Sequence, residues 1–206
     1  LKGLENCTGL EKLTVENGKV ADLHFLSGMS NLTELHLSGN NIQDLSALSS
    51  LTSLQTLDLS GNKIENLSGL PNSLQTLDLS GNTDLKDLSE LSGLPSLKTL
   101  DVSNTKVRDL TGLPTGLTSL KASGNNIEDM SKISNLTSLE TLDLSNNLIR
   151  VLTDLSRFNS LTTLKLQDNA FADIDSLGSK LPDSIKGADW KNSVFGTPSS
   201  ETVDKT

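Results

Sequence analysis

The chain has 206 residues, a net charge of −9 at neutral pH and a pI of about 4.6. This acidic balance disfavours a nucleic-acid backbone or an anionic membrane as a partner, and no stretch has the roughly 20 apolar residues that a membrane helix needs. Aromatic residues are only 2% of the chain and Cys7 is its single cysteine, which argues against an enzyme pocket built from large rings and excludes an internal disulfide or a cysteine metal site.

One unit of 20 to 23 residues recurs along the chain. The ten residues SLQTLDLSGN stand at 53–62 and again at 73–82. Residues 1–9 match the second half of a unit, and a degenerate ninth copy begins at Ile185. The pattern L-x-x-L-x-L-x-x-N-x-I begins at Leu10, Leu32, Leu54, Leu74, Leu97, Leu117, Leu139 and Leu161. Self-similarity at this period predicts a solenoid, in which each unit buries its apolar face against its neighbours.

The first half of each unit predicts a short β-strand. In TLDLSGN at 56–62, leucines alternate with polar residues, which is typical of a strand with one buried face. One strand per unit, always in the same direction, gives a parallel sheet. Thr105 and Gly18 stand after the strand in two units, where we expect weaker hydrogen bonding. In the other units an asparagine can satisfy backbone groups at the turn and form a ladder with its neighbours: Asn40, Asn62, Asn82, Asn125, Asn147 and Asn169.

The second half of each unit has a different period. Leucines recur every three residues, which suits 3₁₀-like turns because side chains at i and i+3 eclipse there; one such series is Leu45, Leu48, Leu51 and Leu54. An aspartate precedes several of these segments, as a helix cap would: Asp44, Asp87, Asp109 and Asp129. Two shorter units carry Leu70-Pro71 and Leu113-Pro114. Proline fixes φ and donates no hydrogen bond, so we expect these units to be more extended.

The chain resembles leucine-rich repeat proteins, because eight successive units match at the expected spacing. The 22-residue unit with NNIQDLSAL at 40–48 is most similar to the bacterial internalin-type class. The resemblance implies an α/β fold: a curved solenoid with a parallel sheet on the concave side and 3₁₀, short helical or extended segments on the convex side.

The two ends of the repeat array are expected to differ from its middle. The solenoid should span residues 1–195, with a partial first repeat, eight full repeats and a degenerate capping repeat. Trp190 and Phe195 are expected to close the core in that last repeat. Residues 196–206 (GTPSSETVDKT) read as a polar tail or a linker to a further domain.

The outward positions of the strands form columns that should line the concave face. Candidate partner-binding residues are Glu34, His36, Thr56, Asp58, Thr76, Asp78, Thr99, Asp101, Lys121, Asp143 and Lys165. Asp58, Asp78 and Asp101 are predicted to stand on adjacent strands. They are either consensus residues of a solvated face or an acidic stripe for a basic partner or a calcium ion, and calcium is the weaker reading because three collinear carboxylates do not wrap a cation. Departures from the consensus, such as Lys121 and Arg150-Val151, are further candidates for partner contacts.

The sequence contains no catalytic motif, so we expect no enzyme, no cofactor and no metal site. The first hypothesis is a monomeric protein-binding domain, displayed on a Gram-positive bacterial surface or secreted, that contacts a host receptor or matrix protein. This location and partner are implied by the internalin resemblance. The alternatives are a cytosolic regulatory subunit of the phosphatase-regulator type and a structural spacer.

Overall fold

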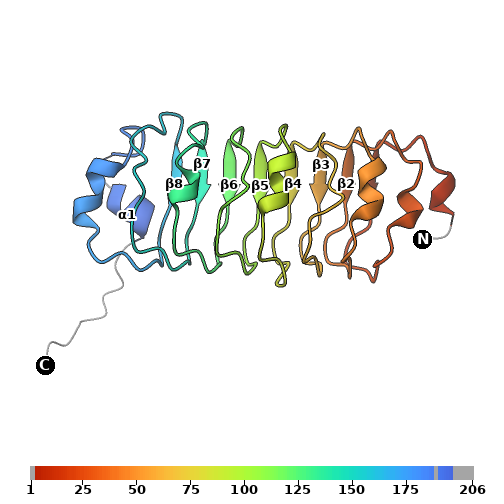
Figure 1. The fold of residues 1–206 in the computed structure, drawn as a ribbon, viewed down its shortest axis with the longest axis horizontal. Helices are drawn as coiled ribbons and strands as arrows, with labels where there is room; N and C mark the ends of the chain where they lie inside the picture. The colour runs from red at the N-terminus through yellow and green to blue at the C-terminus, as the bar shows by residue number, and fades with distance from the viewer. Residues whose placement is uncertain (1–2, 188–189, 197–206) are drawn as a thin grey trace, which may run out of the picture.

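The computed structural model describes residues 3–187 and 190–196. It has eight short strands: β1 (Lys12–Thr14), β2 (Glu34–His36), β3 (Thr56–Asp58), β4 (Thr76–Asp78), β5 (Thr99–Asp101), β6 (Ser119–Lys121), β7 (Thr141–Asp143) and β8 (Thr163–Lys165). They form one parallel sheet in chain order, and the units stack along the long axis of an elongated molecule (Figure 1). This arrangement confirms the predicted leucine-rich solenoid.

Each strand is three residues long, and its central residue points into the core. Leu57 and Leu77 are paired in the register of β3 and β4, and both are buried. The residues on either side of these leucines point outward and are half-buried. The strand pairing therefore places like residues opposite each other although the unit length varies, as the repeat predicted.

The second halves of the units run along the side opposite the strands. Six 3₁₀ helices lie in the described part of the chain: η1 (Leu4–Asn6), η2 (His24–Leu26), η3 (Ser46–Ser50), η4 (Ser89–Gly93), η5 (Ser131–Ile133) and η6 (Asp175–Lys180). The expected aspartates act just before them: Asp44 Oδ1 accepts the Ser46 N–H at 2.8 Å, and Asp87 does the same for Ser89. These aspartates precede the N-cap residue itself, so the bond is an Asx turn rather than a standard cap.

The units with Leu70-Pro71 and Leu113-Pro114 contain turns and no 3₁₀ helix within this described stretch, in agreement with the sequence. Gly112 lies in the second of them, at φ +88°, and a Cβ there would stand 2.5 Å from Ser89 Cα of the preceding unit. These shorter units therefore pack closely on their neighbours, and glycine allows that approach.

The ends of the solenoid differ from its middle. Leu10 and Leu13 in the first unit are only partly buried, whereas the corresponding leucines of central units are inaccessible. At the other end, helix α1 (Trp190–Phe195) lies beside β8 and buries Phe195 (Figure 1). Leu1, Ala188 and residues 197–206 lie outside the described residues.

Helix α1 takes the place of a ninth strand. The Leu166 N–H donates to the Val194 carbonyl at 2.7 Å, as strand-end amides elsewhere donate to the following unit. Phe195 makes edge-to-face contacts with Phe171 and Trp190, at centroid distances of 5.4 and 6.1 Å. A degenerate repeat predicts closure of the core, but its helical form does not follow from the strand pattern.

Candidate functional site

The outward side chains of β1–β8 form one surface, which we call the strand face. It has two columns in register. The first holds Lys12, Glu34, Thr56, Thr76, Thr99, Ser119, Thr141 and Thr163, and the second holds Thr14, His36, Asp58, Asp78, Asp101, Lys121, Asp143 and Lys165. The candidate partner-binding residues named from the strand columns all lie on this face, whereas Arg150 and Val151 lie outside it. Neighbouring strands in such a sheet are about 4.8 Å apart, so each column is a closely spaced row of polar groups.

Three carboxylates stand side by side at the centre of the strand face. The register pairs Asp58 with Asp78 and Asp78 with Asp101. Burial raises the pKa of Asp78; hydrogen bonds from Ser80 oppose that rise, and the charges of Asp101 and Asp58 add to it. We call these three residues the acidic centre. Its middle member is held in a position that disfavours its own charge.

Cations flank the acidic centre on one side. Lys121 Nζ lies 3.7 Å from Asp101 Oδ2, and Lys165 Nζ lies 3.6 Å from Asp143 Oδ2 on the next strand pair. Lys121 and Lys165 therefore have partners within the face, which gives these departures from consensus a role inside the molecule. No ion pair reaches Asp78 in the part of the chain that the structure describes, which leaves its charge without a cation.

The other column is uncharged over its last six positions, from Thr56 to Thr163, because threonine or serine occupies each. Together the columns give a polar surface without phenylalanine, tyrosine or tryptophan. Aromatic side chains anchor many protein interfaces. Electrostatics and hydrogen bonding are therefore the chemistry that the strand face offers.

The asparagine ladder lies behind one end of the strands. Asn62 Nδ2 donates to the carbonyls of Leu37, in the preceding unit, and Leu59, in its own unit, both at 2.9 Å. Its Oδ1 accepts the Ile42 N–H at 3.0 Å. The structure places the other predicted asparagines in the same kind of bonds: Asn40, Asn82, Asn125, Asn147 and Asn169. The ladder joins successive units by side-chain hydrogen bonds behind the strand face.

The ladder changes at Thr105, as the sequence indicated. The Thr105 hydroxyl lies 3.0 Å from the Val102 carbonyl and 2.6 Å from Asn125 Oδ1. Among the residues described here, its side chain makes no hydrogen bond to the preceding unit. These two units therefore lack the ladder bond, and backbone hydrogen bonds, packing and the Lys106–Asp84 ion pair join them.

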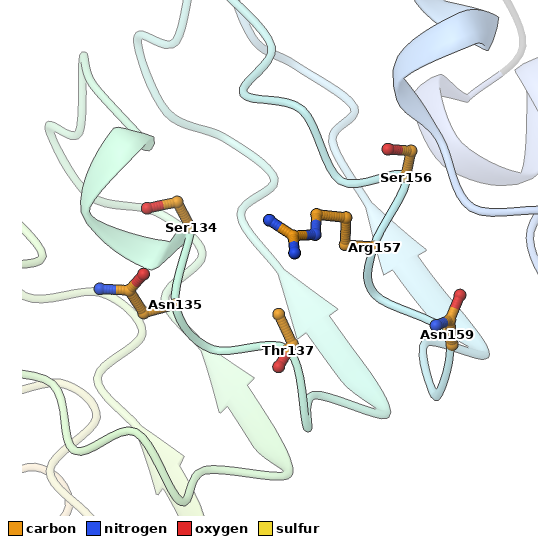
Figure 2. Close-up of a pocket in the computed structure, with 6 residues that line it drawn as sticks. All are labelled: Ser134, Asn135, Thr137, Ser156, Arg157 and Asn159. Atoms are coloured by element: carbon orange, nitrogen blue, oxygen red, sulfur yellow. The ribbon is translucent and has the colours of Figure 1, made fainter.

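A second polar surface lies away from the strand face, on the segments that precede β7 and β8. It is a hollow lined by Ser134, Asn135, Thr137, Ser156, Arg157 and Asn159 (Figure 2). Figure 2 shows the Arg157 side chain reaching into the space between the two segments. Sequence reasoning did not single out this arginine, because the repeat pattern gives no signal for a hollow between adjacent turns. No nucleophile paired with a base lines it.

Arg150-Val151 replaces the usual capping position in its unit. Val151 is 69% exposed and no 3₁₀ helix follows within the described residues 150–160. Asp154 instead accepts the Ser156 N–H at 2.9 Å, which turns the chain three residues later. The loss of the usual capping aspartate agrees with the sequence, whereas the hydrogen bond from the Ser156 N–H to Asp154 was not predicted.

Comparisons with known proteins show which family has this architecture. The profile described as Leucine Rich repeats (2 copies) matches residues 30–72, 73–115 and 115–160. Internalin C2 of Listeria monocytogenes is 31% identical, with a TM-score of 0.78 over 86% of this chain and 80% of that one. Internalin InlF of the same organism is 29% identical, with a TM-score of 0.64 over 86% and 67%. TLR13, in a complex with ssRNA13, is 28% identical, with a TM-score of 0.70 over 81% and 26%.

None of the curated proteins gives a significant match to this chain. In the described residues, no helix has the length and apolar character needed to cross a membrane.

Proposed function

Because this chain belongs to the leucine-rich repeat proteins of the internalin type, we propose that its strand face binds a basic surface of a host or matrix protein. Leucine-rich repeat domains of this family are non-enzymatic protein-interaction modules. Beyond this general role, the proposal specifies a partner and a location. The domain acts as a monomeric adhesin, secreted or on a bacterial surface, and contributes to virulence. Two internalins with similar structures support this placement.

The acidic centre is the single observation that carries the proposal. Asp78 has a carboxylate on each side and no cation of its own in the described chain. A lysine or arginine of a partner, placed over Asp78, would supply the missing opposite charge. Charge complementarity of this kind favours encounter and fixes orientation. A single-stranded RNA, such as the one bound by TLR13, is disfavoured because its phosphates would meet these carboxylates.

The hydrogen bonding behind the strand face also supports this surface as the binding site. Sheet hydrogen bonds join neighbouring strands, the asparagine ladder joins most of the units, and the central leucines of β2–β8 are buried. A rigid surface loses little conformational entropy on binding, so modest polar contacts spread over several strands suffice for affinity. Two alternative roles, a cytosolic adaptor and a spacer, make different predictions in the same assay.

The test is binding of the labelled chain to intact mammalian cells and, separately, to proteins of a cytosolic lysate. A variant carries Asp58→Lys, Asp78→Lys and Asp101→Lys. Its control carries Glu65→Lys, Glu90→Lys and Glu128→Lys, which change the net charge equally at exposed positions away from the strand face.

We expect saturable binding to cells that the strand-face variant loses and the control retains. Binding to the lysate alone would contradict the extracellular role in favour of the adaptor. No binding to either sample would contradict it in favour of a spacer. Equal binding by both variants would move the contact away from the strand face.

A further inference from the structure

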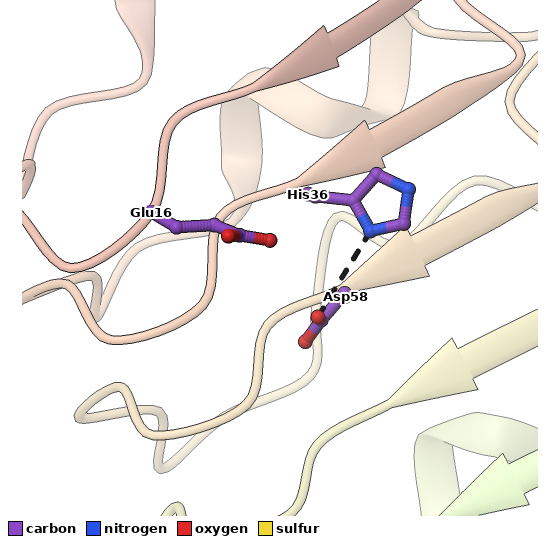
Figure 3. A group of neighbouring side chains, drawn as sticks. All are labelled: Glu16, His36 and Asp58. Atoms are coloured by element: carbon purple, nitrogen blue, oxygen red, sulfur yellow. Dashed lines mark ion pairs between the residues drawn. The ribbon is translucent and has the colours of Figure 1, made fainter.

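Three side chains from three successive units meet near the N-terminal end of the strand face. Glu16 follows β1, His36 ends β2 and Asp58 ends β3. Each offers one ligand atom, and these atoms all lie within 4.8 Å of one another. Figure 3 shows the Glu16 side chain extending toward His36 and the ion pair that joins the His36 ring to Asp58.

We propose that Glu16, His36 and Asp58 form a binding site for a divalent transition-metal ion of the zinc class. The site goes beyond the proposed function, because it needs no protein partner. It also departs from the sequence-based expectation of no metal site. A search for single motifs misses it because its three ligands are about 20 residues apart and only stacking brings them together.

The ligand atoms stand somewhat farther apart than those around a bound tetrahedral ion, and small movements would bring them together. Bonds from zinc to histidine nitrogen and carboxylate oxygen are about 2.0–2.2 Å, so ligand atoms around it stand roughly 3.3–3.6 Å apart. His36 Nδ1 lies 3.9 Å from Asp58 Oδ2 and needs a small inward movement. Glu16 is exposed and can close the remaining gap by rotation of its side chain.

The Asp58 carboxylate is already oriented by a neighbouring residue. Its Oδ1 accepts the Ser60 N–H at 2.9 Å and the Ser60 hydroxyl at 2.7 Å. The other oxygen, Oδ2, is the one turned toward His36. Hydrogen bonds of this kind, to the atom that does not bind the metal, hold ligands in place and raise metal affinity.

The ligand set selects the type of ion. Calcium and magnesium prefer oxygen ligands, whereas an imidazole nitrogen with two carboxylates suits zinc and neighbouring transition metals. Three protein ligands leave one tetrahedral position open. Because His36 and Asp58 are half-exposed on the strand face, that position faces solvent.

The chain supplies its own control. Its only other histidine is His24, which lies on the opposite side of the solenoid in η2 and contacts Asp22. In the described residues no third ligand atom completes a cluster with that pair. His24 therefore contacts one carboxylate, Asp22, and Asp44 acts on it only through its charge, whereas His36 has two carboxylates within its cluster.

The test is a calorimetric titration of the full chain with zinc chloride, in a buffer that does not chelate zinc. We expect one zinc ion per chain for the wild type and for His24→Gln. We expect at least tenfold weaker binding for His36→Gln, and roughly tenfold weaker binding for Ser60→Ala, which keeps all three ligands. An equal molar amount of calcium should not displace the zinc.

The imidazole proton signals of the two histidines give an independent readout in an NMR titration. Zinc should shift one set, and that set should be missing from His36→Gln. Equal zinc binding by the wild type and His36→Gln would overturn the proposal. So would a zinc-induced shift confined to His24, or no zinc binding by a wild-type chain whose circular dichroism shows it to be folded.

Discussion

Replacing Asn82 with alanine tests the idea that the asparagine ladder joins the units. Asn82 is fully buried, and its side chain makes three hydrogen bonds. It donates to the carbonyls of Leu59 and Leu79 at 3.0 and 2.7 Å, and it accepts the Ile64 N–H at 3.0 Å. At about 1 kcal/mol for each bond, Asn82→Ala should lower the free energy of unfolding by about 3 kcal/mol. The effect should be larger where water cannot replace the lost partners.

The matched control is Asn169→Ala. Asn169 makes the same kinds of bonds, but it is only half-buried and water can replace part of what is lost. Urea unfolding followed by circular dichroism gives both free energies, with the slope of the transition checked for a change in cooperativity. A loss below about 1 kcal/mol for Asn82→Ala, or a loss no larger than that of Asn169→Ala, would refute the reasoning.

Three further variants test the charge, the close packing and the core. Asp78→Asn should raise thermal stability by a few tenths of a kcal/mol at neutral pH, because like charges on adjacent strands repel. The pKa of Asp78 is raised in the fold, so the stability of the wild type falls as the pH rises from the ordinary pKa of about 3.9 through the raised pKa. The advantage of Asp78→Asn should therefore vanish at a pH below this range. Melting curves of both proteins, recorded at neutral pH and below this range, check the prediction. Gly112→Ala should cost more than about 1 kcal/mol, whereas Gly93→Ala, where a Cβ meets nothing within 4 Å, should cost little; urea midpoints compare them. Leu120→Ala, at a fully buried position, should cost about 2–5 kcal/mol in the same assay.

The sequence predicted those features that one unit repeats in the next. Leu57 and Leu77 occupy the same position of successive units, so their pairing and burial follow from unit length and strand alternation. The column of Asp58, Asp78 and Asp101 follows in the same way. The positions of the ladder asparagines were also accessible, because each stands after a strand.

Contacts between side chains at non-equivalent positions of different units could not be predicted from the sequence. The approach of Glu16 to His36 and Asp58 depends on side-chain rotamers across three units. The pairing of Lys121 with Asp101 is of the same kind: position in a column suggests a neighbour, but only coordinates show the 3.7 Å contact. Helix α1 differs for another reason, since a degenerate repeat has too few pattern positions to fix its local structure.

The binding of the strand face to a basic partner is tested most directly by removing its charge without changing its shape. A variant with Asp58→Asn, Asp78→Asn and Asp101→Asn is nearly isosteric with the wild type. Dissociation constants for saturable binding to mammalian cells should be measured for both proteins at low and high salt. We predict about tenfold or more weaker binding by the variant at low salt, with the wild type approaching it as salt rises. Equal dissociation constants at low salt would contradict the account.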